Sequence, residues 1–143
     1  MKIEPYTAGL IKENPYKNKR IITGKIIVIL DIIINERKMK LIHPISRALT
    51  KYSICELAIT NEPNITPGSI VNNVGFIGFM EIIDGGVAVI GDKVYVEDNL
   101  IGVIAGFNED HAPNHITILI KGNQLTTGTK LGIDLEDTVK IMM

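Results

Sequence analysis

The sequence predicts an all-β fold, mainly antiparallel, in the form of a small closed β-barrel of roughly 7–9 strands with at most one or two short helical turns. β-branched residues dominate the chain and good helix formers are sparse, which favours strands. Strand-like stretches follow one another at short spacing, separated by Gly, Pro, Asn and Asp turns. Three of these turns share one pattern, which is typical of small barrels in which each turn returns the chain across the core.

The expected elements follow in chain order from these patterns. The sequence predicts strands over residues 21–34, 37–42, 53–60, 69–83 with an interruption, 87–97, 100–106, 115–121 and 137–142. One helical turn is expected between Pro44 and Lys51. At 143 residues the chain has the length of one domain. We therefore expect an extended N-terminal arm over residues 1–20 and a single β-barrel domain over residues 21–143.

The shared turn pattern occurs as TPGSIV at residues 66–71, IGDKVYV at 90–96 and LEDTVKI at 135–141. In each copy, a tight turn that carries Ser or Asp precedes a strand whose alternating side chains are expected to point inward. The third copy lacks the glycine of the other two.

Two further local patterns concern glycines and a hairpin. The glycines of VGFIGF at 74–79 and IGVIAGF at 101–107 lie inside apolar strands, where they often mark bulges or close backbone approaches. The stretch YVEDNLIG at 95–102 predicts a hairpin with Asp98 and Asn99 as its two-residue turn, because both residue types tolerate positive φ.

The run from Ile26 to Ile34 is apolar at both alternating faces. A strand that is buried on both sides needs cover on its outer face. We therefore expect either a contact between copies in a homo-oligomer or cover by the N-terminal arm.

Composition and charge exclude several classes of function. The net charge is −1 and the charges are interspersed, so no basic face suggests nucleic acid. The longest apolar run is far short of the roughly 20 residues that span a bilayer, so no membrane partner is expected. The N-terminal residues lack the apolar core of a signal peptide, which predicts a cytoplasmic protein. The lone Cys55 can form neither an internal disulfide nor a zinc site of paired cysteines, and we interpret it as a buried thiol.

The densest cluster of titratable groups lies in GFNEDHAPNH, residues 106–115, between two expected strands. Loops on a rigid scaffold are where binding residues concentrate. The candidate ligand-binding residues of this loop are Glu109, Asp110, His111, Asn114 and His115. Imidazole and carboxylate together could hold a divalent transition metal, with His111, His115 and Glu109 as ligands.

A purely structural interpretation of the same loop is equally specific. Asn108 or Asp110 would cap the turn, and Pro113 would fix its exit. His115 would then begin the next strand with its ring hydrogen-bonded to backbone.

A second candidate cluster lies in LIHPISRAL, residues 41–49, which sets His43, Ser46 and Arg47 in an apolar context. Arginine is scarce in this chain, and its fork of donors suits a carboxylate or phosphate. The alternatives are a surface ion pair for Arg47, a helix cap for Ser46, and a nucleophilic Ser46 with His43 as its base.

Several stretches together resemble a known family. They are PISR, PGSIVNNVGFIGFMEI, GGVAVIGDKVYV, IGVIAGFNEDHAPNHITILI and TGTKLGIDLEDTVKI. They look like an uncharacterised bacterial family known only as a domain of unknown function, over roughly residues 21–142, with the 106–115 pattern as its most distinctive part. This resemblance implies a fold and a candidate site but no established activity.

A remoter resemblance is carried by GDKVYVEDNLIGVIAGFNEDHAPNHITILIKG. This layout is similar to the glucitol/sorbitol-specific IIA component of the sugar phosphotransferase system. The resemblance implies a small cytoplasmic β-barrel in which a histidine carries a phosphoryl group, and His43 would match that position.

Three functional hypotheses follow. The first is a homo-oligomeric barrel that binds a small anionic molecule or a metal ion through the 106–115 loop, with His43, Ser46 and Arg47 nearby. The second is an enzyme, either a phosphocarrier that uses His43 or a metal-dependent hydrolase or lyase that uses His111, His115 and Glu109. The third is a structural partner subunit without a ligand.

Overall fold

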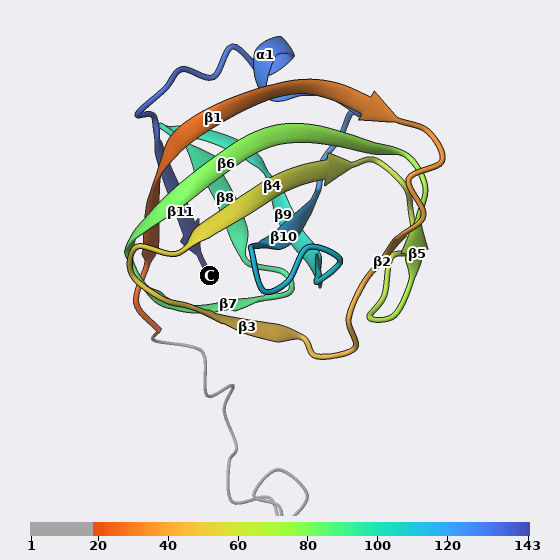
Figure 1. Ribbon diagram of the computed structural model, residues 1–143, viewed down its shortest axis with the longest axis horizontal. Coiled ribbons are helices and arrows are strands. Elements are labelled where there is room, and N and C mark those ends of the chain that lie inside the picture. Colours follow the sequence, from red (N-terminus) through yellow and green to blue (C-terminus); the bar gives the residue numbers. More distant parts are fainter. Residues whose placement is uncertain (1–18) are drawn as a thin grey trace, which may run out of the picture.

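The computed structural model describes residues 19–143, and in this part of the chain the fold is all-β. Seven strands form a closed barrel in the order β1-β11-β8-β9-β10-β4-β6 (Figure 1). The barrel strands are β1 Ile22–Ile34, β4 Ile54–Thr60, β6 Val74–Asp84, β8 Lys93–Val96, β9 Asn99–Asn108, β10 Ile116–Lys121 and β11 Thr138–Met142. The prediction of a closed, mainly antiparallel barrel is confirmed.

Two short ribbons lie outside the closed barrel. One pairs β2 (Met39–Lys40) with β5 (Ile70–Val71), and the other pairs β3 (Ser46–Leu49) with β7 (Gly86–Val89). Figure 1 shows the β3–β7 ribbon running below the barrel strands and the β2–β5 ribbon at one side. The closed barrel is therefore accompanied by two accessory two-stranded ribbons.

All ladders of the described barrel are antiparallel except the one between β10 and β4, which is parallel and pairs Ile116 with Cys55. A parallel pair needs a long crossover connection rather than a hairpin. This connection contains β5 to β9, so residues far apart in sequence meet where β4 and β10 begin.

Apolar side chains form two clusters. The larger one fills the barrel with Ile, Leu, Val, Met and Phe, including the fully buried Phe107. The smaller one packs Met39, Leu41 and Val71 of the β2–β5 region against Ala58 and Leu119 of the barrel wall. The wall from β4 to β10 is thus apolar on both faces along part of its length, because it separates two cores.

The shared turn pattern corresponds to one backbone structure. The third turn residue has positive φ in every copy, at Gly68 (84°), Gly91 (93°) and Glu136 (71°). The Ser or Asp that follows donates its backbone N–H to the carbonyl oxygen of the residue three positions earlier. Its side-chain oxygen accepts a hydrogen bond from the backbone N–H of that earlier residue. Glu136 therefore occupies a position for which glycine is suited.

A fourth copy of this turn was not predicted. Ser53 donates its backbone N–H to the Thr50 carbonyl at 3.1 Å, and the intervening Tyr52 has a φ of 73°. Here the Ser53 hydroxyl donates to the Thr50 carbonyl at 2.7 Å instead of accepting from an N–H. Because Tyr52 replaces glycine, the sequence carried little signal for a turn at this place.

The glycines inside strands lie at bulges and close approaches, as predicted. Register shifts occur in β6 between the partners of Leu57 and Ala58, and in β9 close to Gly102 and Gly106. A Cβ at Gly75 would overlap the Thr126 carbonyl oxygen. Glycine is therefore required at this position by space rather than by φ.

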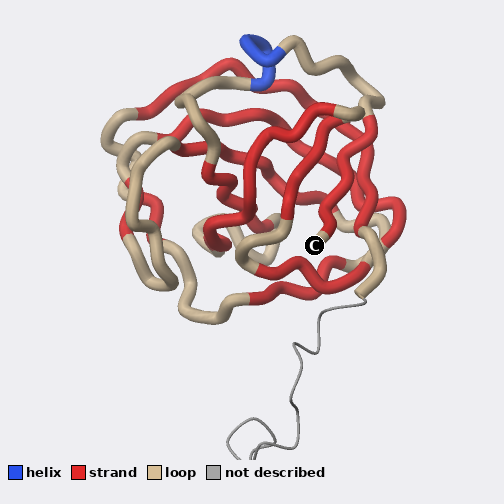
Figure 2. Tube along the Cα trace, turned by 180° about the vertical axis from the view of Figure 1, so that it is seen from behind, coloured by secondary structure: helices blue, strands red, loops and turns tan. Residues whose placement is uncertain are grey.

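The structure corrects four local predictions. Residues 44–51 hold no helical turn, because Ser46–Leu49 pairs with β7 as a strand. The four-residue helix α1 lies instead at Gly128–Leu131, capped by Thr127, and is the only helix of residues 19–143 (Figure 2). The hairpin turn consists of Glu97 and Asp98 rather than Asp98 and Asn99, since Val96 pairs with Asn99. The strands expected over 37–42 and 87–97 are shorter, because the chain turns beside each of them.

The expected outer cover of β1 is only partly accounted for. Gly128 of α1 packs against Ile29, whereas Val28, Ile32 and Ile34 remain exposed. The N-terminal arm predicted to cover them lies outside the described residues except for Lys19 and Arg20. In residues 19–143 no helix is long and apolar enough to cross a membrane.

Candidate functional site

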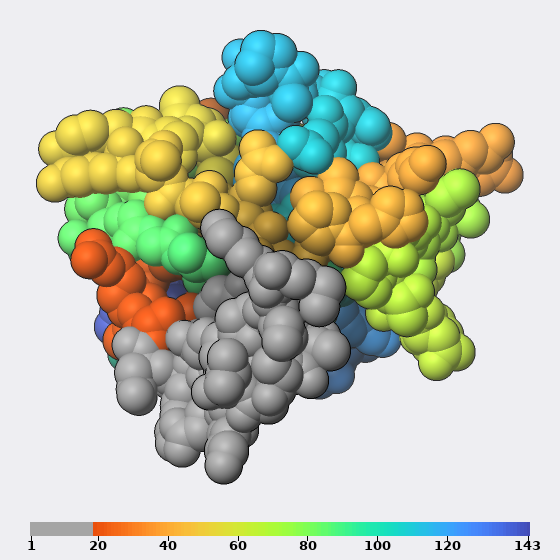
Figure 3. Space-filling model, turned by 90° about the horizontal axis from the view of Figure 1, so that it is seen from below, coloured from red at the N-terminus to blue at the C-terminus, as the bar shows by residue number. Residues whose placement is uncertain are grey.

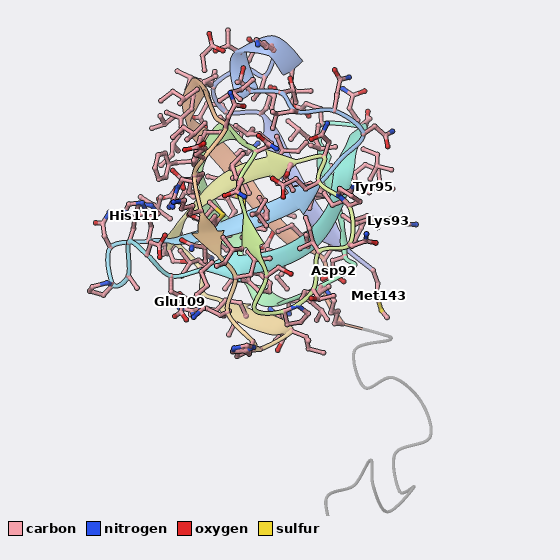
Figure 4. The ribbon with its side chains drawn as sticks, turned by 90° about the vertical axis from the view of Figure 1, so that its right-hand side faces the viewer. Asp92, Lys93, Tyr95, Glu109, His111 and Met143 are labelled. Atoms are coloured by element: carbon pink, nitrogen blue, oxygen red, sulfur yellow. The ribbon has the colours of Figure 1, made fainter. Side chains whose placement is uncertain are left out.

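The loop between β9 and β10 is ordered by its own capping interactions. Asn108 ends β9 with its side chain buried, and its Oδ1 accepts the Asp110 N–H at 3.1 Å. The Asn108 amide also donates to the Lys40 carbonyl at 2.8 Å, which ties the loop to β2. The prediction that Asn108 caps the turn is confirmed. Figure 4 shows the loop with Glu109 and His111 projecting on the side opposite Asp92, Lys93 and Tyr95.

Two ion pairs fix the loop to the segment that connects β1 with β4. Arg47 Nη1 lies 2.7 Å from Glu109 Oε2, and Arg37 Nη2 lies 3.0 Å from Asp110 Oδ2. The 41–49 and 106–115 clusters therefore meet in space. The structural alternative for Arg47, a surface ion pair, is what the structure shows.

The two histidines of the loop stack on each other. Their ring centroids are 5.0 Å apart, and the His115 ring also meets Phe79 edge to face at 5.0 Å. His115 Nδ1 lies 2.9 Å from the side-chain nitrogen of Asn114. His115 is therefore not bonded to backbone through its ring, which corrects the structural interpretation on this point.

The Nε2 atom of His115 is buried and has no hydrogen-bond partner in the described part of the chain. It is the one buried side-chain nitrogen or oxygen without a hydrogen-bond partner in residues 19–143. Most buried polar atoms find a partner in protein or in ordered water, so an unpaired one needs an explanation.

A pocket of about 370 Å³ lies between β3 and this loop. Its walls are formed by residues 47–50, 52–55 and 112–116, and we refer to it as the β3 pocket. Figure 3 shows the segment around residue 50 beside the 108–115 loop along one edge of the molecule. Arg47, Asn114 and His115 therefore line the β3 pocket together with residues of the turn from Thr50 to Ser53, which was not predicted.

The other predicted residues lie elsewhere. His43 is exposed and lines a second hollow of about 430 Å³ together with Glu109 and Asp110. Ser46 pairs with Val89 in the ribbon and lines neither hollow, and neither does His111.

The metal interpretation lacks a preformed ligand set. No three His, Cys, Asp or Glu side chains of residues 19–143 lie close enough together to hold a metal ion. Glu109 instead faces Arg47, and the His111 and His115 rings stack.

Cys55 was expected to be buried, but its place in the lining of the β3 pocket was not predicted. Burial raises the pKa of its thiol to about 11, and the positive charge of Arg47 offsets part of this increase. The thiol is therefore protonated at neutral pH and is a weak nucleophile.

A model described as a family of unknown function (DUF6917) matches residues 16–142. No curated protein and no solved structure matches the chain. The resemblance to the glucitol/sorbitol-specific IIA component therefore finds no support.

Proposed function

The chain belongs to this family of unknown function, and we propose that it binds a small organic anion in the β3 pocket. The observation that carries the proposal is that His115, whose buried Nε2 is unpaired, lines the same pocket as Arg47. No acidic side chain is among the described residues that line this pocket.

The tautomer of His115 follows from its neighbour. The Asn114 amide nitrogen can only donate, so His115 Nδ1 accepts and the ring proton lies on Nε2. A buried donor without an acceptor costs roughly 1–3 kcal/mol. An anionic oxygen that reaches Nε2 would accept a hydrogen bond from its N–H and remove that cost.

Arg47 supplies the charge. Its contact with Glu109 uses Nη1, and a guanidinium has five N–H donors. Both side chains of this pair are partly exposed, so the pair itself is worth little and leaves Arg47 available to a second carboxylate.

Binding is better supported than covalent catalysis. The thiol that lines the pocket belongs to Cys55, whose raised pKa of about 11 keeps it protonated. Ser53 uses its hydroxyl proton in the turn, where it donates to Thr50. We therefore favour a ligand that is held rather than attacked.

The test uses benzoate as probe, observed by ligand-detected NMR, with benzamide as the uncharged control. The chain offers matched pairs of variants. Arg47→Met is compared with Arg37→Met, because both arginines hold the same loop but only Arg47 lines the pocket. His115→Phe is compared with His111→Phe, because the two rings stack but only His115 lines the pocket.

We expect benzoate to bind and benzamide not to bind. Arg47→Met and His115→Phe should each weaken benzoate binding by roughly tenfold or more, as the loss of a hydrogen bond to a charged group predicts. Arg37→Met and His111→Phe should leave it within about twofold. Equal effects in both members of a pair would mean that the loop fold, and not the pocket, is being measured.

A further inference from the structure

The free edge of β3 suggests what kind of anion the pocket takes. We propose that the β3 pocket binds the carboxyl-terminal residues of an extended peptide, which adds to β3 as a third, antiparallel strand of the β3–β7 ribbon. This inference rests on the proposed function, because the peptide carboxylate is the anion that Arg47 and His115 would hold.

The register shows which backbone groups are free. β3 pairs only with β7, in the described part of the chain, and Arg47 lies opposite Ala88. The Ile90 N–H donates to the Ile45 carbonyl at 2.9 Å, so the 45/90 pair is hydrogen-bonded. Hydrogen-bonded and non-bonded pairs alternate along an antiparallel ladder. The N–H and C=O of Ala48 therefore point away from β7.

The residue that carries these free groups lines the pocket. Residues 47–50 and residues 112–116 both contribute to the lining of the β3 pocket. No other backbone partner for Ala48 is present in residues 19–143. An unpaired edge beside a groove is the arrangement that binds peptides by strand addition.

The direction of the peptide follows from the positive charge of Arg47, which attracts the peptide carboxylate. An antiparallel strand on β3 runs from Thr50 toward Arg47, so its carboxyl end arrives beside Arg47. The residue opposite Ala48 is then the second from the peptide's end. Apolar peptide side chains would contact Ile54 and Tyr52, which are 42% and 66% exposed and line the same pocket.

The test compares a peptide with the carboxylate alone. The probes are acetyl-Thr-Val-Ile with a free carboxyl end, its carboxamide, and 3-methylpentanoate, a carboxylate without an amide group, titrated into the full chain by calorimetry. We expect the peptide acid to bind roughly tenfold more tightly than 3-methylpentanoate, because two backbone hydrogen bonds are added. The carboxamide should lose at least tenfold, as removal of the charge predicts.

The decisive variant is Ala48→Pro. Proline removes the outward N–H of Ala48, which β7 does not use, and it is tolerated on edge strands. This variant should bind the peptide no more tightly than 3-methylpentanoate, while its affinity for 3-methylpentanoate stays within about twofold of the parent. Ala48→Ser, which keeps the N–H, is the matched control and should bind the peptide as the parent does.

An N-methylated peptide keeps the test independent of the folding of Ala48→Pro. Methylation of the valine nitrogen blocks pairing with Ala48 and should remove the tenfold gain. If Ala48→Pro and the N-methylated peptide retain full affinity, strand addition is wrong although anion binding stands. If 3-methylpentanoate and benzoate both fail to bind the parent, the proposed function fails as well.

Discussion

At the scale of a single residue, His115 carries a cost in stability. Its Nε2 is buried without a partner, while Phe79, His111 and Asn114 hold the ring in place. Such an unpaired group persists when something other than stability selects it, and ligand binding is the use that the pocket suggests.

We therefore predict that His115→Phe is not destabilising. Phenylalanine keeps the ring contacts and removes the unpaired donor, so the free energy of unfolding should rise by about 1 kcal/mol. Urea unfolding measures this change, with His111→Phe as control and an expected effect within about 0.5 kcal/mol. A loss of more than about 1 kcal/mol in His115→Phe would mean that Nε2 has a partner in solution.

Cys55 predicts a pH dependence of stability. Burial raises the pKa of its thiol from 9.0 to about 11 in the folded chain. Between these two values the unfolded chain releases the proton while the folded chain keeps it, so the free energy of unfolding falls as the pH rises. The contribution is present below pH 9 and is lost as the pH approaches about 11, on the order of 2 kcal/mol.

Comparison with Cys55→Ala isolates this contribution from lysine and tyrosine titration. Urea unfolding of both proteins at several pH values in this window should show the parent losing stability faster than the variant. Parallel stability curves would contradict the assignment of a raised thiol pKa.

The site was only partly predictable at the residue scale. The 106–115 loop and Arg47 stood out because charged groups interrupt apolar strands there. The pairing of Arg47 with Glu109 was not predictable, since more than sixty residues separate them. The positions of Ile54 and Cys55 at the pocket could not be predicted, because the sequence at the start of a short apolar strand is the same whether the strand lines a pocket or a core.

At the scale of elements, the repeated turn predicts opposite effects for two substitutions. Gly91 and Glu136 occupy the same turn position with φ of 93° and 71°. An added Cβ at Gly91 meets nothing within 4 Å, so Gly91→Ala should lower the free energy of unfolding by about 1 kcal/mol through φ alone. Glu136→Gly should raise it by about 0.5 kcal/mol, because the relieved strain exceeds the added chain entropy.

Urea unfolding measures both effects. A shift of the midpoint at an unchanged m-value would report a change in stability, and not a change in the compactness of the unfolded or folded state. The opposite sign at Glu136 would show that its side chain contributes an interaction that outweighs the backbone strain.

The elements themselves were largely predictable, and the exceptions have physical reasons. Alternation and turn residues located most barrel strands, because a strand that faces a core needs period-two patterning. A helical turn was expected where β3 lies, and the residues SRAL of β3 include no β-branched residue that would indicate a strand. Its strand conformation comes from tertiary pairing with β7, which local propensity does not encode.

At the scale of the whole molecule, the order of the strands around the barrel could not be predicted from the sequence. Turn chemistry predicts neighbours along the chain, whereas the parallel pairing of β10 with β4 joins segments separated by five other strands. This pairing places the 106–115 loop beside β3 and so creates the β3 pocket. The site is therefore a consequence of topology, and the sequence alone supplied only its parts.

The outer face of β1 carries the last prediction. Val28, Ile32 and Ile34 expose apolar side chains on one strand, with Ile32 50% exposed. Neighbouring exposed apolar side chains often mark contacts between subunits. We therefore keep the prediction of a homo-oligomer formed through β1.

Native mass spectrometry of the parent, Ile32→Lys and Ile70→Lys tests this prediction. Ile70 lies on β5 and is 60% exposed, so it controls for the loss of an exposed isoleucine elsewhere. The parent should be an oligomer, Ile32→Lys should shift it to the monomer because a lysine charge cannot be buried unpaired, and Ile70→Lys should leave it unchanged. A monomeric parent, or an Ile32→Lys oligomer as stable as the parent, would show that copies do not associate through this face of β1.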